Sequence, residues 1–192
     1  MSIELADEEL AQRAAKGDFR AFEELVRRYS PPLFKFAYVM LNDYEDASDV
    51  LQQVLIQLHT SLPRRYPTAS FKNWAFTITR NKCLDHSRKR RSLNFNELNY
   101  KRNTEDELTV LEQLCDSAPS PEEIVERQDT RQTLHEAIAR LPERDRAVVM
   151  LRYLTDLSFG EIGQILDLPE GSTKTCFQRA KQVLRDYLKH EL

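Results

Sequence analysis

Basic and amide side chains recur on one side of the C-terminal segment of this 192-residue chain. Lys174, Gln178, Lys181 and Arg185 are four, three and four residues apart, so they share one face if the segment is helical. Lysine and arginine neutralise phosphates, while glutamine, serine and threonine reach base edges. The pattern therefore offers nucleic-acid recognition, although an ordinary helical hairpin with a solvated charged face would carry the same residues.

A second group that could do chemistry is the C-x-x-H pair of Cys83 and His86. Structural zinc takes four ligands, and no second pair of ligands accompanies this one. A cysteine nucleophile needs a base that a third group orients, and the sequence suggests no such group. The Gly171–Lys174 segment lacks the glycine spacing of a phosphate-binding loop. We therefore expect no enzyme, no metal and no cofactor, with Cys83 as a buried small apolar residue; a catalytic helical domain around Cys83 and His86 is the alternative.

Two helices joined by a short turn would position the basic face. Ser158 stands where an N-cap satisfies the opening amides, and Asp167 to Pro169 interrupts the apolar period because proline cannot donate within a helix. A short helix that braces a longer basic one is the plan of a helix-turn-helix. The predicted inward residues are Phe159, Ile162 and Leu166 in the first helix, and Thr173, Phe177, Ala180, Leu184 and Leu188 in the second.

The first half of the chain also shows helical apolar periods. We expect helices over residues 4–15, 43–62 and 71–91, and a buried helical pair that begins after an Asp18 cap and is divided or kinked at Pro31-Pro32. In the 71–91 helix, Phe71 and Trp74 read as core residues. Residues 63–70 read as an exposed loop.

Charge is segregated along the chain, although the net charge is only −3. Residues 80–91 are strongly basic, whereas residues 93–128 are acidic and lack a sustained apolar period, which is typical of a linker. The 41% hydrophobic content and only 4 glycines favour folded, long-helical units. We therefore predict an all-α fold of two small helical bundles, residues 1–92 and 129–192, joined by the acidic linker 93–128.

The cysteines and the apolar runs indicate the compartment. Three widely spaced cysteines do not make a disulfide framework, and Cys115 in the linker reads as an unremarkable thiol. No apolar run is long enough for a membrane span, and the start of the sequence lacks a secretion signal. The expected location is therefore the cytoplasm.

Seven short motifs follow one another along the chain: Gly17-Asp18-x-x-Ala21-Phe22, Asp46-x-x-Asp49-x-x-Gln52, Phe71-x-x-Trp74-x-x-x-Ile78-x-x-Asn81-x-x-x-Asp85-x-x-Arg88, Leu141-Pro142-Glu143-Arg144, Leu157-Ser158-x-x-Glu161-Ile162, Gly171-Ser172-x-Lys174 and Arg179-Ala180. Each motif is weak alone, but their order and spacing are specific. Together they resemble the bacterial RNA polymerase sigma factors, specifically the extracytoplasmic-function (ECF) group of the sigma-70 family.

The resemblance implies core RNA polymerase and promoter DNA as partners, with an anti-sigma factor as a further candidate, and it implies neither membrane insertion nor a small-molecule substrate. The surface for core polymerase would comprise Asp46, Asp49, Gln52 and Gln53. The −10 element would be captured and opened by Arg64, Arg65, Tyr66, Arg80, Asn81, Asp85 and Arg88. The −35 element would be read in the major groove by Ser158, Ser172, Lys174, Thr175, Gln178, Arg179 and Lys181.

Three positions depart from the family pattern. Cys176 stands where a basic residue is common, Thr173 where an aliphatic core residue is usual, and Gln53 where an acid is often found.

The resemblance also implies that the acidic linker threads through the polymerase toward the RNA exit path. A helix-turn-helix regulator that binds paired half-sites as a dimer is the alternative, but it would not need both the 46–53 and the 80–91 features.

Overall fold

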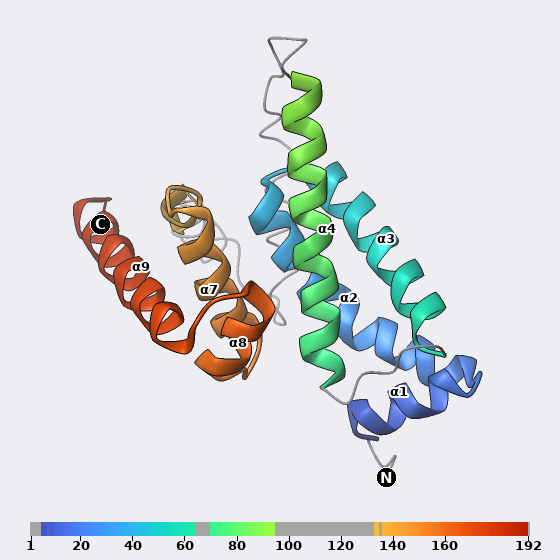
Figure 1. Ribbon diagram of the computed structural model, residues 1–192. Helices are drawn as coiled ribbons and strands as arrows, with labels where there is room; N and C mark the ends of the chain where they lie inside the picture. Colours follow the sequence, from blue (N-terminus) through green and yellow to red (C-terminus); the bar gives the residue numbers. More distant parts are fainter. Residues whose placement is uncertain (1–4, 64–69, 95–132, 135, 192) are drawn as a thin grey trace, which may run out of the picture.

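The structure is a computed structural model that describes residues 5–63, 70–94, 133–134 and 136–191. Every regular element in these ranges is a helix, which confirms the all-α prediction (Figure 1). Arg64, Arg65, Tyr66, Cys115 and most of the predicted linker lie outside the described residues. The labelled helices are α1 (Asp7–Ala15), α2 (Phe19–Leu41), α3 (Tyr44–Ser61), α4 (Phe71–Asn94), α7 (Glu143–Leu154), α8 (Phe159–Leu166) and α9 (Glu170–Glu191), and residues 133–134 and 136–139 are helical as well.

Helices α1 to α4 form the N-terminal bundle, in which α2, α3 and α4 pack on one another and α1 crosses one end (Figure 1). The rings of Phe36 and Phe76 meet edge to face at 5.7 Å between centroids, and both side chains are fully buried. The predicted Asp18 cap is confirmed, since its carboxylate accepts hydrogen bonds from the amides of Arg20 and Ala21. Phe71 is likewise buried, and Trp74 packs against this core.

The prediction that a new helix starts at Pro31-Pro32 is wrong, because both prolines lie inside the continuous 23-residue helix α2, and the alternative of a kink at this point stays a prediction. Two prolines remove two amide donors and disfavour the helix locally. The neighbouring turns nevertheless bury Tyr29, Leu33 and Phe36 against the rest of the bundle. Burial of large apolar side chains, at about 1.5–3 kcal/mol each, offsets the local loss and keeps the helix continuous.

Helices α7, α8 and α9 form the C-terminal bundle. The predicted Ser158 cap is confirmed as a complete capping box: the Ser158 hydroxyl accepts from the Glu161 amide, and the Glu161 carboxylate accepts from the Ser158 amide at 2.8 Å. After α8, Asp167 adopts the left-handed conformation, with φ 55° and ψ 50°, and the chain turns into α9. The helix-turn-helix predicted from the sequence is therefore present.

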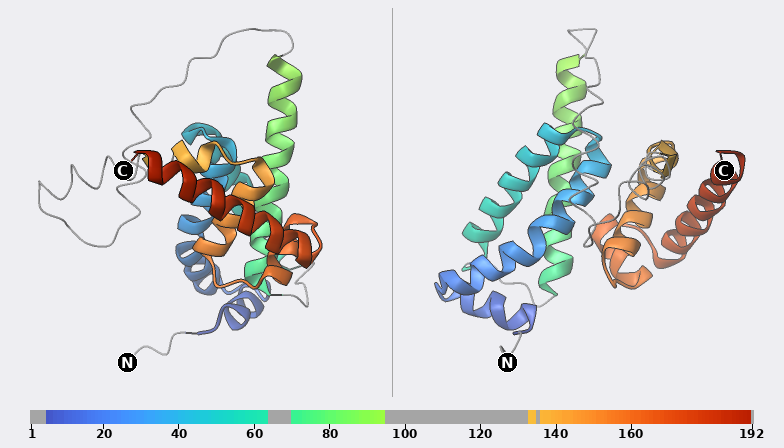
Figure 2. Two further views of the ribbon diagram at one scale, coloured as in Figure 1. Left: turned by 90° about the vertical axis from the view of Figure 1, so that its left-hand side faces the viewer. Right: turned by 180° about the vertical axis from the view of Figure 1, so that it is seen from behind.

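The two bundles pack directly on each other. Helix α7 contacts α2, and α8 lies against α4 (Figures 1 and 2). The buried side chains form one continuous core that runs from Phe36 and Phe76 in the first bundle to Val148, Leu151 and Ile162 in the second. The chain thus has two helical bundles, as predicted, in a closed arrangement that the sequence did not suggest; the predicted boundaries at residues 92/93 and 128/129 stay predictions.

We expect Asp167→Gly to stabilise the C-terminal bundle by roughly 0.5 kcal/mol, because the relief of left-handed strain exceeds the entropy cost of glycine in the unfolded chain. Thermal unfolding followed by circular dichroism measures the effect. Asn42 ends α2 with a similar φ of 54°, so Asn42→Gly is the matched change in the other bundle. A loss of stability in Asp167→Gly alone would show that the Asp167 side chain makes a contribution larger than the strain.

Candidate nucleic-acid interface

The outward face of α9 carries the predicted basic and amide residues. Lys174, Gln178, Lys181 and Arg185 are all exposed, while Thr173 and Ala180 on the opposite side are fully buried. Lys174 pairs with Glu170 at 2.6 Å, and both side chains are more than half exposed. Exposed pairs of this kind contribute less than about 1 kcal/mol, so Lys174 is readily released to a phosphate. Ser172 and Thr175 are also exposed, near the start of α9.

Arg179 differs from these residues because it is already bound to Asp145 of α7. Its Nε donates to Asp145 Oδ2 at 2.6 Å, and its Nη2 donates to Oδ1. The Asp145 side chain has no exposed surface, whereas 56% of the Arg179 side chain is exposed. The guanidinium holds the pKa of Asp145 below its usual range, so the pair stabilises the fold at neutral pH and this contribution is lost as the pH falls through the titration range of the carboxyl.

Sequence reasoning missed Asp145. An acid in the first turn of a helix ordinarily indicates only a favourable interaction with the helix dipole. Its partner lies 34 residues further along the chain, and no local pattern joins the two. Stranding a buried carboxylate such as Asp145 costs about 3–5 kcal/mol, which makes this pair energetically unlike the Glu170–Lys174 pair.

The two departures from the family pattern in α9 have structural explanations. The Thr173 hydroxyl donates to the Pro169 carbonyl at 3.1 Å, so a polar residue is accommodated in a fully buried position. Cys176 is 8% exposed, and its sulfur accepts from Arg179 Nη2 at 3.7 Å. The thiol therefore lies beside the ion pair and does not present a polar group outward. Ser158, predicted to contact DNA, has its hydroxyl in the capping box.

Helix α4 presents the residues predicted for the −10 element. Asn81, Asp85 and Arg88 are exposed, whereas Arg80 is half-buried. Arg80 Nη2 donates to the carbonyl of Leu166, at the end of α8, at 3.2 Å. The closed arrangement thus covers one end of this face with the helix-turn-helix.

The predicted core-polymerase surface lies on α3. Asp49, Gln52 and Gln53 are exposed, but Asp46 is half-buried and accepts from Arg90 Nη1 of α4 at 2.6 Å. Sequence reasoning also missed Ile56, which is 64% exposed one turn beyond Gln52 on the same face of the helix. The available signal was an apolar residue outside the inward period of the helix.

Cys83 and His86 belong to helix packing. Cys83 is 1% exposed, as predicted, and burial raises the pKa of its thiol to about 12. A thiol with so high a pKa is a poor nucleophile and a poor metal ligand at neutral pH. His86 Nε2 lies 3.6 Å from Asp46 Oδ1, at the α3–α4 contact. In the ranges that the structure covers, no group of three histidine, cysteine or acidic residues could hold a metal ion.

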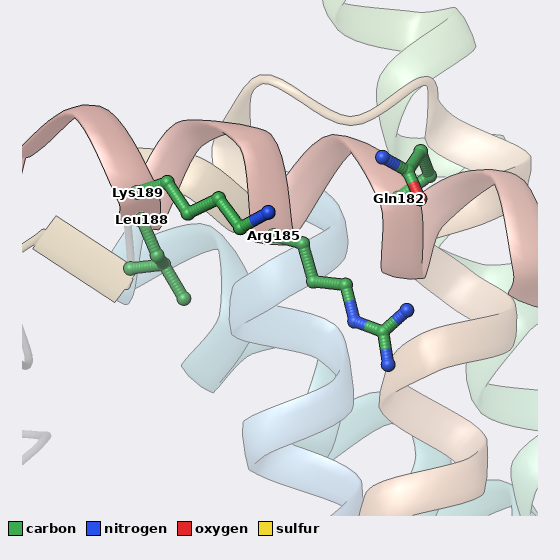
Figure 3. Close-up of a pocket in the computed structure, with 4 residues that line it drawn as sticks. All are labelled: Gln182, Arg185, Leu188 and Lys189. Atoms are coloured by element: carbon green, nitrogen blue, oxygen red, sulfur yellow. The ribbon is translucent and has the colours of Figure 1, made fainter.

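A shallow hollow lies beside the C-terminal half of α9 (Figure 3). Gln182, Arg185, Leu188 and Lys189 line it, so its lining contains neither an acid nor a nucleophile. None of the helices in the described part of the chain is both long and apolar enough to cross a membrane.

A helix-turn-helix with a basic outer face, packed on a second bundle that carries its own basic helix, defines an all-α DNA-binding protein. Residues 25–93 match sigma-70 region 2, and residues 131–184 match sigma-70 region 4. The chain belongs to the extracytoplasmic-function group of the sigma-70 family. It is a sigma factor, which binds core RNA polymerase and directs promoter-specific transcription initiation.

Two relatives illustrate the match. The chain is 31% identical over 175 residues to the ECF RNA polymerase sigma factor RpoE of Cereibacter sphaeroides, covering 89% of this chain and 88% of that protein. It is 28% identical over 187 residues to the ECF RNA polymerase sigma factor SigW of Bacillus subtilis, covering 97% and 99% respectively. The solved structure of CnrH with the cytosolic domain of CnrY shares the fold, with a TM-score of 0.69 and 23% identity over 97% of this chain and 99% of that one.

Proposed function

We propose that the two bundles of this sigma factor divide the promoter between them. Helix α9 would read the −35 element through Ser172, Lys174, Thr175, Gln178 and Lys181, with Ser158 at the start of α8. Helix α4 and the segment before it would capture and open the −10 element, with Arg64, Arg65, Tyr66, Arg80, Asn81, Asp85 and Arg88. The observation that carries the proposal is the exposed basic and amide row of α9, opposite the fully buried Thr173 and Ala180.

Core polymerase would dock on the exposed face of α3, formed by Asp49, Gln52 and Gln53, with Ile56 as an apolar contact in the middle of the surface. Asp46 would act at its edge, where Arg90 holds it. The factor itself would be a cytoplasmic binding protein and not an enzyme, with the polymerase performing the chemistry. An anti-sigma factor would be a further partner, because the sigma factor RpoE of Bartonella quintana, which shares the fold, was solved in complex with the anti-sigma factor NepR.

Simultaneous reading of both elements requires the two bundles to separate. Elements centred at −35 and −10 are about 25 base pairs, or roughly 85 Å, apart along B-DNA. Helix α8 lies directly on α4 in the closed arrangement, so α9 and α4 do not span such a distance. Free chain should therefore bind promoter DNA weakly, and core polymerase should raise the affinity by fixing the spacing between the bundles.

In vitro transcription with purified core polymerase tests the proposal. We expect wild-type protein to direct RNA synthesis from defined start sites, whereas core polymerase alone gives none. A suitable template is DNA that the holoenzyme selects from a random duplex library. Failure to bind core polymerase, or start sites that are the same with and without the protein, would contradict the proposal.

Two single substitutions should separate the roles of the helices. Lys174→Ala should weaken closed-complex binding about tenfold, because a phosphate or base contact contributes roughly 1–3 kcal/mol. Asn81→Ala should leave closed-complex binding almost unchanged and slow strand opening, measured by permanganate reactivity of unpaired thymines. Equal effects of both substitutions on both steps would rule out this division.

A further inference from the structure

The Arg179–Asp145 ion pair differs in kind from the other charges on α9. The Asp145 carboxylate is completely buried on α7, and Arg179 satisfies both of its oxygens with two donors. The Cys176 sulfur accepts from the same guanidinium. If Arg179 turned toward DNA, it would leave a buried, unpaired carboxylate behind. Such a group is more costly than a single DNA contact is favourable.

Lys174 provides the comparison on the same helix. Its partner Glu170 is 55% exposed, so water solvates Glu170 as soon as Lys174 leaves. Lys174 can therefore exchange its partner for a phosphate, whereas Arg179 keeps its partner. The sequence gives no reason to treat the two cations differently. They differ because the partner of Lys174 is exposed and the partner of Arg179 is buried.

The ion pair also fixes the rotation of α9. Arg179 holds α9 to α7 through its side chain, and the adjacent Ala180 packs in a small core with Val149 and Leu141. Consecutive residues of a helix are about 100° apart, so a slip of one residue would turn Lys174 and Gln178 away from the outer face. Two anchors at positions 179 and 180, one ionic and one apolar, define which side chains point outward.

We propose that Arg179 is a positioning residue: bound to Asp145, it orients α9, and it leaves the −35 contacts of this helix to Ser172, Lys174, Thr175, Gln178 and Lys181. This inference rests on the proposed role of α9 at the −35 element. It assigns to Asp145 a part in promoter discrimination, although its side chain has no exposed surface.

The test uses holoenzyme reconstituted from core polymerase and the full chain. The variants are Arg179→Gln, Arg179→Lys, the double variant Asp145→Asn/Arg179→Gln and the control Lys174→Ala. Dissociation constants are measured at several salt concentrations for duplex DNA selected by the wild-type holoenzyme, and for the same DNA with its −35 element scrambled. The discrimination is the ratio of the dissociation constant for the scrambled DNA to that for the selected DNA. The salt slope is the slope of the logarithm of the affinity against the logarithm of the salt concentration, and it reports the number of phosphate contacts.

We expect Lys174→Ala to reduce the salt slope by about one. The double variant replaces the ion pair by a neutral amide pair of similar shape, so it should keep the wild-type slope and a discrimination within about twofold of wild type. Arg179→Gln should lose about tenfold in discrimination because Asp145 is left unpaired. Arg179→Lys should also lose several-fold, since lysine lacks the two-pronged geometry of arginine, while its slope stays unchanged.

A double variant that loses about tenfold in discrimination, or whose slope falls by about one as in Lys174→Ala, would overturn the inference and make Arg179 a DNA contact. If the double variant does not fold, Arg179→Lys still separates the ion pair from a phosphate contact, because a phosphate-binding role predicts that lysine retains wild-type discrimination. If Lys174→Ala and wild type bind the selected DNA alike, the proposed role of α9 is itself wrong. Failure of the inference about Arg179 and failure of the proposed role of α9 at the −35 element therefore give different results.

Discussion

Replacing Gly163 with valine should unfold the helix-turn-helix and abolish −35 recognition. A Cβ atom at this position would lie 2.5 Å from the Leu168 carbonyl oxygen and 3.1 Å from the Thr173 hydroxyl oxygen. The carbonyl is part of the backbone of the turn, and the Leu168 amide itself donates to the Gly163 carbonyl at 2.8 Å. The turn has no room to move aside, so the branched side chain would separate α8 from α9.

The expected loss for Gly163→Ala is smaller, because two effects oppose each other. Alanine gains up to about 1 kcal/mol over glycine within a helix, whereas overpacking of a tight contact costs about 1–3 kcal/mol. We expect a net loss of roughly 1 kcal/mol for alanine and at least 3 kcal/mol for valine. Urea unfolding followed by circular dichroism measures both.

Gly160 supplies the matched control on the same helix. A Cβ atom there meets its nearest neighbour, the flexible carboxylate of Glu170, at 3.5 Å, which is ordinary contact. Gly160→Ala should therefore be neutral or should stabilise the bundle by up to about 1 kcal/mol. Equal losses at positions 160 and 163 would show that helix propensity, and not the close approach to the turn, decides the outcome.

The sequence predicted most of the helices and their caps because these depend on neighbouring residues. Asp18 and Ser158 were identified as caps from the residues around them, and the structure confirms both. The start of a new helix at Pro31-Pro32 was predicted by the same local logic and is wrong. Burial against distant helices outweighs the local cost of proline, and sequence periodicity does not report that balance.

In the candidate site, too, the sequence predicts features that depend on neighbouring residues but not ion pairs between distant ones. Exposure of Lys174 and Gln178 follows from the helical period alone. The engagement of Arg179 by Asp145, and of Asp46 by Arg90, joins residues 34 and 44 positions apart. The spacing of residues in the sequence predicts neither pair. The two pairs determine which of the predicted site residues are already bound within the fold and which can bind DNA or the polymerase.

The closed arrangement gives a second large prediction: locking α8 to α4 should abolish promoter-specific transcription. Glu161 of α8 accepts hydrogen bonds from Ser158, and Asn73 and Lys72 of α4 lie close enough to lower its pKa further. Cysteines at positions 73 and 161 can therefore be bridged by a short, thiol-cleavable bis-maleimide. Since the two promoter elements lie roughly 85 Å apart, the bridged protein should lose at least tenfold in start-site-specific RNA.

The native cysteines allow a selective bridge. Cys83 and Cys176 are buried, and burial raises the pKa of both thiols, so maleimide reacts with them slowly. Cys115→Ser in every variant removes the remaining thiol. Cleavage of the bridge should restore transcription in the same sample, and Glu161→Cys alone reports the loss of the α8 capping box. Full activity of the bridged protein would mean that α4 works at the promoter while α8 still covers it, and the requirement for separation would then be wrong.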